Sequence, residues 1–346
     1  MSKNYVPYYA IVEIIYKCNL KCLHCASSLN NNPQRESLLS DSELYDLFDQ
    51  LKALGCQYIT LSGGEPLLHP SWDKFAQYLR ENGIIPTMVS NGMLIDSKMA
   101  NKIKNSGLRV VALSLDGNED VHNYIRNNKE AYNNVIKAAK NLKDVGMQVN
   151  FITSVTKKNL HMLHYIENLV YELNGDFWQI QLGSAIGSLK DNIELALDPK
   201  DTKSVVDFII EAKNRNKVKI TTSDTIGYCY QEDILNLNQK TGHVTKFSGC
   251  YAGKRVIGIE ANGNVKGCLS LQDDRFIEGN IRKEKLSEIW NKEGNFSYTR
   301  NFDTHLLSGV CQDCKYGEKC KGGCSFMSLG ATGSLHNNPY CIQHYI

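Results

Sequence analysis

The sequence of 346 residues predicts an α/β fold, a partial (β/α)6 barrel of the TIM type followed by a small C-terminal domain. Apolar, β-branched runs alternate with amphipathic stretches over roughly the first two thirds of the chain, which is typical of a parallel, mostly buried sheet. From Cys250 onward the sequence changes to short strands, glycine turns and cysteines. Within it, GIEANGNVKGC at 258–268 predicts a hairpin with an Asn-Gly turn that leads to Cys268. We therefore expect a barrel domain over 1–223, an irregular linker over 224–248 and a small domain over 249–346.

Six apolar runs supply the strands expected in the barrel. They span residues 13–16, 57–61, 86–92, 108–117, 147–155 and 176–183. Amphipathic stretches between or after these runs are expected to be helices at 39–55, 96–105, 129–145, 159–173 and 200–214. The first helix carries apolar residues at i, i+3, i+4 and i+7, beginning at Leu44. Ser40 and Glu43 form its expected capping box, and Gly55 suits its exit.

Composition and charge exclude several classes of function. A net charge of +2 and a pI near 7.9 give no support for broad nucleic-acid binding. No apolar run reaches the roughly 18 residues of a membrane span, and the N-terminus MSKNYVPYY does not resemble a signal peptide. We therefore predict a cytoplasmic protein that binds neither nucleic acid nor membranes. In that reducing compartment, the 12 cysteines favour metal binding over disulfides.

Three cysteines lie within eight positions, directly after the apolar run 11–15. Cys18, Cys22 and Cys25 have the spacing C-x3-C-x2-C. Soft thiolates select zinc, copper or iron–sulfur clusters. With His24 as a fourth ligand they would complete a structural zinc site. Alternatively, three thiolates hold a 4Fe–4S cluster and leave one iron open. The loop is expected at the carboxyl end of a barrel strand, where chemistry takes place, and this position favours the cluster.

Three more motifs end predicted strands or follow them closely: SGGEP at 62–66, LSLDG at 113–117 and HNYIR at 122–126. Together with the cysteine loop, they resemble the motifs of the radical S-adenosylmethionine (radical SAM) enzymes over roughly residues 8–220. The resemblance implies that the Gly63 and Gly64 backbone approaches the methionine amine of the cofactor. It also implies contacts to the ribose from LSLDG and to the cofactor carboxylate from Arg126. The cofactor-binding residues expected on this basis are His24, Ser62, Gly63, Gly64, Glu65, Asn91, Ser114, Asp116 and Arg126, with His24 near the adenine and Asn91 in the strand-end motif SNG.

The chemistry that this resemblance implies belongs to the cofactors. A 4Fe–4S cluster on Cys18, Cys22 and Cys25 binds the amino and carboxylate groups of S-adenosylmethionine through its open iron. One electron, supplied by a donor such as flavodoxin or ferredoxin, cleaves the cofactor to a 5′-deoxyadenosyl radical. That radical takes a hydrogen atom from the substrate.

The C-terminal cysteines form a second group. A run such as Cys311-x2-Cys314-x5-Cys320 alone could be a zinc ribbon. The whole pattern resembles the SPASM extension of radical SAM enzymes, which carries two auxiliary 4Fe–4S clusters, so that three clusters are expected in all. The resemblance assigns a distal cluster to Cys311, Cys314, Cys320 and Cys341, and a nearer cluster to Cys250, Cys268 and Cys324, with Cys229 available as its fourth ligand. Cys56 is expected to pack in the core.

The substrate expected from this resemblance is a peptide, as in ribosomal-peptide maturases. Modification would be a thioether or carbon–carbon crosslink, or an epimerisation. Leu269 and Ser27 replace the Asp and Tyr expected in sulfatase maturases, which argues against that activity. Because the first barrel strand begins near residue 8, a separate leader-binding protein is an expected partner. A small molecule such as a tetrapyrrole, or a non-enzymatic metal-binding redox sensor, are the alternatives.

Overall fold

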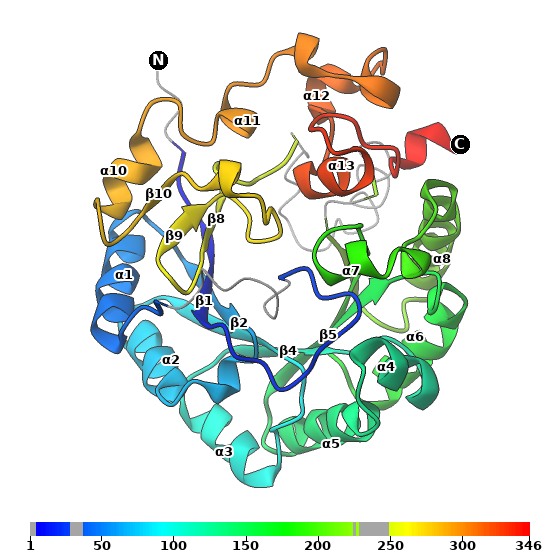
Figure 1. Ribbon diagram of the computed structural model, residues 1–346. Coiled ribbons are helices and arrows are strands. Elements are labelled where there is room, and N and C mark those ends of the chain that lie inside the picture. Colours follow the sequence, from blue (N-terminus) through cyan, green and yellow to red (C-terminus); the bar gives the residue numbers. More distant parts are fainter. Residues whose placement is uncertain (1–4, 28–36, 224–225, 228–248) are drawn as a thin grey trace.

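The computed structural model describes residues 5–27, 37–223, 226–227 and 249–346. Within these residues, one 10-stranded sheet has the order β10-β9-β8-β1-β2-β3-β4-β5-β6-β7. The strands from β8 to β7 in this order are parallel, while β9 and β10 are antiparallel to their neighbours. The sheet curls inside an arc of helices, which confirms the predicted α/β partial barrel (Figure 1).

All six strands predicted for the barrel are present, each followed by at least one helix. Their bounds are β1 Tyr9–Ile15, β2 Tyr58–Gly63, β3 Ile85–Ser90, β4 Val110–Ser114, β5 Gln148–Val155 and β6 Phe177–Leu182. Buried residues alternate along β3, β5 and β6, because one face of each strand packs on the helices and the other faces the barrel interior.

The helices around the barrel include every stretch predicted from periodicity. They are α1 Asp41–Ala53, α2 Trp72–Glu81, α3 Ser97–Asn105, α4 Glu119–Arg126, α5 Ala131–Asp144, α6 Leu163–Glu172, α7 Ser188–Asp191 and α8 Thr202–Arg215. The predicted capping box at Ser40 and Glu43 begins α1. Helices α2 and α4 were not predicted. Helix α4 contains the HNYIR motif in its last five residues.

The sheet extends beyond the six predicted strands at both edges. Strand β7, Ile220–Thr222, pairs with β6. At the other edge β8, Val256–Ile259, pairs in parallel with β1. The predicted hairpin with its Asn-Gly turn is present, since β8 is antiparallel to β9, Asn264–Lys266, and Gly263 adopts φ +90°. The C-terminal segment thus continues the barrel sheet through backbone hydrogen bonds.

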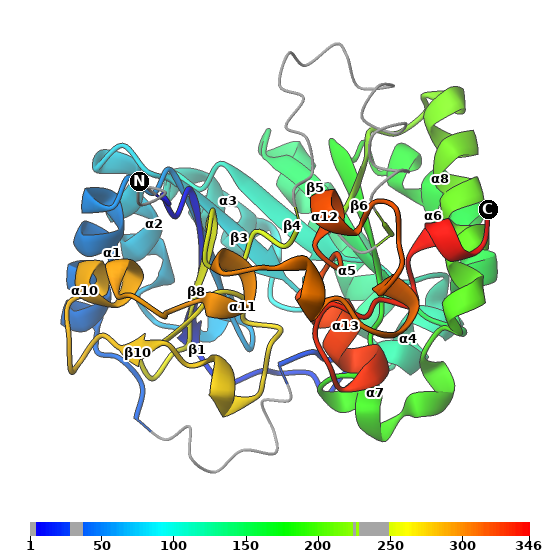
Figure 2. The same ribbon diagram turned by 90° about the horizontal axis from the view of Figure 1, so that it is seen from above.

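The remaining C-terminal elements cover one edge of the barrel and its mouth. They are β10 Gly279–Asn280, α10 Leu286–Asn291, α11 Ser297–Arg300, α12 Gly317–Cys320 and α13 Ser325–Thr332. Helix α10 packs on α1, where Gln50 Oε1 accepts a hydrogen bond from the Leu286 backbone. Helix α13 lies beside α7 in both ribbon views (Figure 2). The two cysteine-bearing regions therefore meet over the carboxyl ends of the barrel strands.

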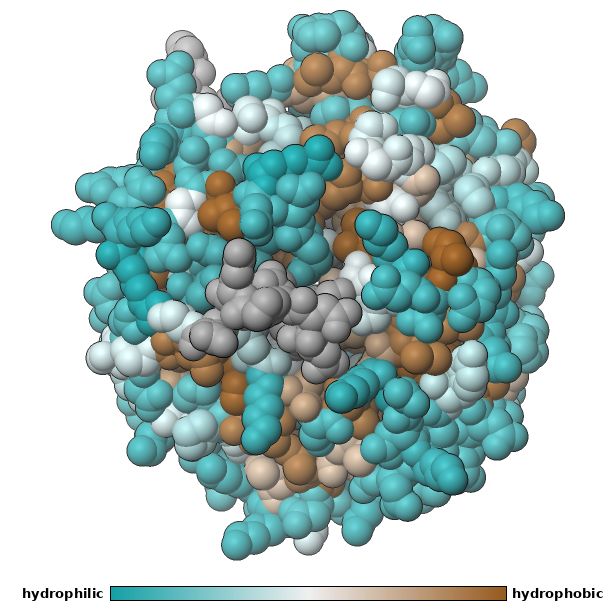
Figure 3. Space-filling model, in the orientation of Figure 1, coloured by the Kyte–Doolittle hydropathy of each residue, from teal (hydrophilic) through white to brown (hydrophobic). Residues whose placement is uncertain are grey.

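Hydrophobic residues are mostly enclosed between the sheet and its helices. One large cluster of buried side chains runs from β1 to the C-terminal segment, and Cys56 belongs to it as predicted. Hydrophilic residues cover much of the rim of the face in Figure 3, and hydrophobic ones are visible nearer its centre. Among the described residues, no helix has the length and apolar character needed to cross a membrane.

Ile257 tests whether β8 stabilises the barrel. It is fully buried on β8 opposite Ala10 of β1, so Ile257→Ala is expected to lower the free energy of unfolding by about 2–5 kcal/mol. Ile193→Ala, at a residue that is 58% exposed, is the control and should change it by less than about 0.5 kcal/mol. Denaturant unfolding followed by circular dichroism measures both. Equal effects of the two substitutions would contradict a stabilising role for β8.

Candidate active site

The loop that follows β1 presents Cys18, Cys22 and Cys25, and all three are partly buried. The first residues of this loop are held by the end of β2. Backbone amides of Gly64 and Glu65 donate to the carbonyls of Ile15 and Lys17, at 2.9 and 3.0 Å. A Cβ at Gly63 or Gly64 would lie well under 3.0 Å from those same carbonyl oxygens. The two glycines are therefore required for the cysteine loop to pack against β2.

The far end of the loop is held by two other segments. The Leu23 amide donates to the Ile125 carbonyl at the end of α4, at 2.9 Å. Ser188 donates its amide to the Cys25 carbonyl, also at 2.9 Å. Gly187 precedes it with φ +65°, and a Cβ there would collide with the Cys25 carbonyl. The backbone of the cysteine loop is thus fixed at both ends by strand-end segments of the barrel.

Asn91, at the end of β3, holds the start of the loop through its side chain. Its Nδ2 donates to Asn19 Oδ1 at 2.7 Å and lies 3.9 Å from Cys18 Sγ. The Leu20 amide lies 3.5 Å from the same sulfur. Two N–H donors are therefore directed at Cys18, and such donors stabilise a thiolate that binds metal.

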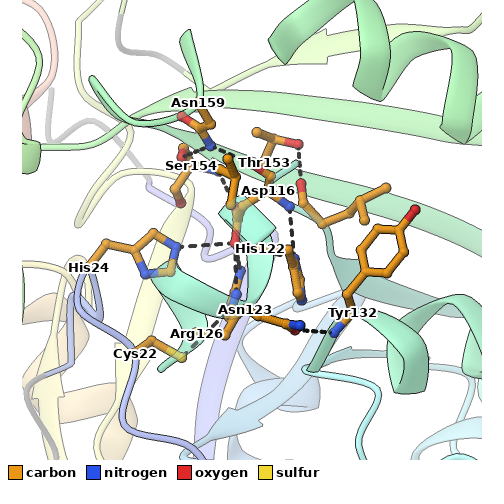
Figure 4. A network of polar contacts seen from close by, with 12 residues as sticks. Cys22, His24, Asp116, His122, Asn123, Arg126, Tyr132, Thr153, Ser154 and Asn159 are labelled. Atoms are coloured by element: carbon orange, nitrogen blue, oxygen red, sulfur yellow. Dashed lines mark hydrogen bonds and ion pairs between the residues drawn. The ribbon is translucent and has the colours of Figure 1, made fainter. Parts of the chain in front are cut away.

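A buried carboxylate, Asp116, organises the side chains around Cys22 and His24 (Figure 4). Arg126 donates to its Oδ2 through Nε at 2.7 Å and contacts it through Nη2 at 2.6 Å. His24 Nε2 lies 3.5 Å from the same oxygen. The Ser154 amide donates to Oδ1 at 3.2 Å. Asp116 is fully buried, so this network replaces the water that the charge would otherwise need.

The charges of this network follow from burial and pairing. Burial alone would raise the pKa of Asp116, but Arg126, His24 and His122 outweigh it and hold the pKa well below its ordinary range. Burial lowers the pKa of His122 to about 3, so its ring is neutral at pH 7. His122 Nδ1 accepts the Asp116 amide at 3.1 Å, which places the ring proton on Nε2. A carboxylate and a guanidinium thus remain charged inside the protein.

Arg126 also links this network to the cysteines. Its Nη1 lies 3.8 Å from Cys22 Sγ. Burial raises the pKa of the Cys22 thiol to about 11, although the guanidinium acts in the opposite direction. A buried thiol of this kind becomes a thiolate when a soft metal takes the place of its proton. The three thiols, with Asn91 and Arg126 directed at two of them, fit an iron–sulfur cluster.

Other residues expected at the cofactor occupy different positions around this loop. Ser62 is the penultimate residue of β2 and Ser114 is the last residue of β4, and both are partly buried. The Glu65 side chain is only 1% exposed and accepts hydrogen bonds from the Ser90 hydroxyl and the Asn91 amide at 2.8 and 2.9 Å. Its carboxylate therefore ties the ends of β2 and β3 together inside the protein.

A cavity of about 240 Å³ connects the barrel mouth with the C-terminal segment. Barrel residues His24, Ser154 and Gln181 line one side of it. Cys250, Cys268 and Cys324, the three cysteines assigned to the nearer cluster, all line the cavity. The structure thus places these cysteines, which are up to 74 positions apart in sequence, at the wall of one space next to the active-site loop.

The other C-terminal cysteines surround a separate, smaller cavity of about 20 Å³. Its lining contains all four cysteines assigned to the distal cluster, Cys311, Cys314, Cys320 and Cys341. Three of them are buried, and burial raises the pKa of the Cys311 and Cys320 thiols. The grouping of these four cysteines around one cavity is compatible with either a cluster or a zinc ribbon.

Comparison with protein families identifies both parts of the chain. Residues 12–170 match the radical SAM superfamily, and residues 250–315 match the SPASM iron–sulfur cluster-binding domain. The chain is a radical SAM enzyme with a SPASM domain. Together, the two domains indicate iron–sulfur clusters and binding of S-adenosylmethionine.

Curated and solved relatives of this radical SAM enzyme differ in their substrates. AdoMet-dependent heme synthase of Methanosarcina barkeri is 26% identical and covers 95% of each chain. Mycofactocin maturase MftC of Mycolicibacterium smegmatis is 25% identical over 96% of this chain and 81% of its own length. The crystal structure of Streptococcus suis SuiB bound to its precursor peptide SuiA superposes with a TM-score of 0.75 at 18% identity, covering 97% of this chain and 74% of that one.

Sequence reasoning missed several residues that position the radical SAM site. Asn159 is buried and donates to the carbonyls of Asp116 and Ser154, at 3.0 and 3.1 Å. Asn19 and Gly187 hold the cysteine loop as described above. Their common signal is a small amide residue or glycine just after a barrel strand or inside the cysteine loop. Cys229, suggested as a ligand of the nearer cluster, lies outside the described residues.

Gly187 tests the fixation of the cysteine loop. Gly187→Ala would force its Cβ against the Cys25 carbonyl, so we expect cluster loading on the loop to fall and 5′-deoxyadenosine formation to drop by about 10²-fold. Gly83→Ala is the matched control, because Gly83 has φ +78° but a Cβ there meets nothing within 4 Å. Iron analysis and product quantification measure both. Equal losses of iron and of 5′-deoxyadenosine formation in the two variants would mean that backbone strain alone, and not the collision with Cys25, causes the effect.

Glu65 should make stability depend on pH. Burial raises its pKa from 4.5 to about 7, so between these values the folded protein holds a proton that the unfolded chain has lost. The free energy of unfolding should therefore fall as pH rises from about 4.5 to 7, by at most about 1.4 kcal/mol per pH unit. Glu65→Gln removes this contribution, so the difference between variant and wild type should grow with pH. Parallel stability curves would contradict this.

Proposed function

We propose that this enzyme abstracts a hydrogen atom from a residue of a peptide, in the cavity between the barrel mouth and the C-terminal cysteines. The uncharged lining of that cavity carries the proposal. Its described walls consist of apolar, hydroxyl, amide and thiol side chains together with His24. A neutral peptide residue satisfies such a lining without a buried charge.

The size of the cavity supports the same substrate class. About 240 Å³ lies below the ~300–1,000 Å³ of pockets that enclose drug-sized ligands. A cluster on Cys250, Cys268 and Cys324 would occupy part of this space. The remainder suits one side chain inserted from a longer chain. A tetrapyrrole is a larger macrocycle, and its several carboxylates bind best to cationic partners.

The residues of the chain then have distinct parts. Cys18, Cys22 and Cys25 would hold the active-site cluster, with Asn91 and Arg126 directed at the sulfurs of Cys18 and Cys22. When bound, the cluster and S-adenosylmethionine supply a 5′-deoxyadenosyl radical. His24 and Gln181 line the cavity and would orient the substrate, while the enclosing walls exclude water from a reactive site. Ser62, Gly63, Gly64, Ser114 and Asp116 remain the proposed surroundings of the cofactor.

Two auxiliary clusters would complete a set of three. Their cysteines are grouped as three around the larger cavity and four around the smaller one. A cluster on the nearer group would put a redox centre at the wall of the substrate cavity, which suits reactions that remove an electron from the substrate, such as crosslinking. An external electron donor and a separate leader-binding protein belong to the same proposal.

The second candidate substrate is a tetrapyrrole, favoured by the similarity to heme synthase over 95% of both chains. MftC, a maturase, is similar over nearly as much of this chain, so overall similarity does not separate the two candidates. The cavity lining supports the peptide, because carboxylate groups of a tetrapyrrole would face neutral walls.

The deciding experiment is anaerobic incubation of the reconstituted enzyme with S-adenosylmethionine, a reductant and either candidate precursor peptides or iron–coproporphyrin. We expect modified peptide, detected by its change in mass, and 5′-deoxyadenosine to form in equal amounts. The Cys18→Ala/Cys22→Ala/Cys25→Ala variant is the control and should form neither product. Turnover of the porphyrin well above that of any peptide would overturn the peptide assignment. Cofactor cleavage by the wild type would also exclude the non-enzymatic metal-binding redox sensor.

A further inference from the structure

Helix α11 carries a tyrosine whose hydroxyl is buried without a partner beside the nearer cysteine group. Among the described residues, no hydrogen-bond partner accompanies Tyr298 Oη, although the atom is inaccessible to solvent. A phenol is an amphipathic group, and its hydroxyl normally finds a partner when it is buried. The hydroxyl therefore points to a group that the described residues do not supply.

The position of this hydroxyl is set by close packing against the two cysteine-bearing segments. A Cβ on Gly267, the residue before Cys268, would lie well under 3.0 Å from Tyr298 Oη. The same hypothetical atom would collide with the backbone of Ala252 and Gly253, shortly after Cys250. The hydroxyl thus sits where both segments converge, and Gly267 leaves room for it.

The neighbours of Tyr298 on α11 fix the segment that follows Cys250. Thr299 Oγ1 donates to the Ala252 carbonyl at 2.7 Å, and Arg300 Nε donates to the Gly253 carbonyl at 2.6 Å. The Tyr298 ring packs edge-on against Phe276, with ring centroids 5.2 Å apart. Neither the ring nor the helix is free to turn the hydroxyl elsewhere, so its direction is a fixed property of the fold.

The ionisable groups that act on the hydroxyl are Cys250, Cys268, Glu278 and Arg300. A phenol hydroxyl is an O–H donor. Cluster sulfurs and cysteine thiolates are acceptors, and hydrogen bonds to them are among the factors that set the reduction potential.

We propose that Tyr298 donates a hydrogen bond to a sulfur of the iron–sulfur cluster held by Cys250, Cys268 and Cys324, and so raises its reduction potential. The proposal rests on the nearer cluster of the proposed function, but not on the identity of the substrate. A donor stabilises the more negative, reduced form of a cluster, so its removal makes reduction harder. Tyr298 is thus a positioning and tuning residue rather than a catalytic one.

The test measures the midpoint potential of the nearer cluster in the full-length protein by redox titration with electron paramagnetic resonance. Cys18, Cys22 and Cys25 are replaced by Ala to silence the active-site cluster, and Cys250→Ala assigns the nearer signal by its loss. Tyr298→Phe keeps the ring against Phe276 and removes only the hydroxyl. We expect a shift to more negative potential in the nearer cluster, with the distal cluster unchanged as an internal reference. Tyr78→Phe, which removes a hydroxyl bonded to Asp49 on the outer helices, is the matched control and should shift neither.

Fluorinated tyrosine at position 298 gives a second, independent measurement. It keeps the hydroxyl but makes it a stronger donor, so the potential should shift in the positive direction. If the Tyr298→Phe protein fails to retain iron, the fluorotyrosine protein alone tests the proposal. An unchanged potential in the fluorotyrosine protein, or in an iron-loaded Tyr298→Phe protein, would overturn the proposal. Failure of peptide turnover would leave these potentials unaffected, so the two proposals fail separately.

Discussion

A single buried charge, the carboxylate of Asp116, determines how the mouth of this barrel is arranged. An uncompensated carboxylate in the interior would be very costly, and here one guanidinium, a histidine and one backbone amide compensate it. The ion pair with this carboxylate fixes the position of Arg126, and Nη1 of Arg126 in turn contacts Cys22 Sγ. The position of one cysteine therefore follows from the electrostatics of a residue almost a hundred positions away in sequence. The neutral ring of His122 completes this arrangement without adding a second positive charge.

The cysteine loop itself has little regular structure and is ordered by the segments around it. Backbone contacts with the ends of β2 and α4 and with the start of α7 hold it at both ends. Glycine at 63, 64 and 187 permits these contacts, because any side chain would meet a carbonyl oxygen. The same glycines that a motif search attributes to cofactor contact therefore also have a structural role. Both roles require the absence of a side chain, and sequence alone does not separate them.

Much of the fold could be predicted because its signals are local. Strand runs, helix periodicity, the Ser40 capping box and the Asn-Gly hairpin depend on neighbours in sequence, and the structure contains each of them. The cysteine spacing and strand-end motifs likewise pointed to the family. Helices α2 and α4 were missed although their signals are local, since Trp72, Phe75, Ala76 and Leu79 of α2 lie at i, i+3, i+4 and i+7. Strand β7 and the pairing of β8 with β1 were missed because β7 has only three residues and both pairings join segments that are distant in sequence. Asn159 and Tyr298 could not have been found, since their importance arises from what lies beside them only after folding.

Pairing of β8 with β1 has a consequence for how such enzymes can be recombined. Neighbouring strands lie about 4.8 Å apart, so the hairpin that leads to Cys268 keeps a rigid spacing from the strand that leads to Cys18. Exchange of the C-terminal cysteine region between relatives would transplant a sheet edge as well as a metal-binding module. A chimera would have to preserve the register of Tyr9 with Val256, and a mismatch of one residue would turn every β8 side chain to the opposite face. Compatibility between halves of different origin thus depends on the backbone hydrogen bonds between β1 and β8.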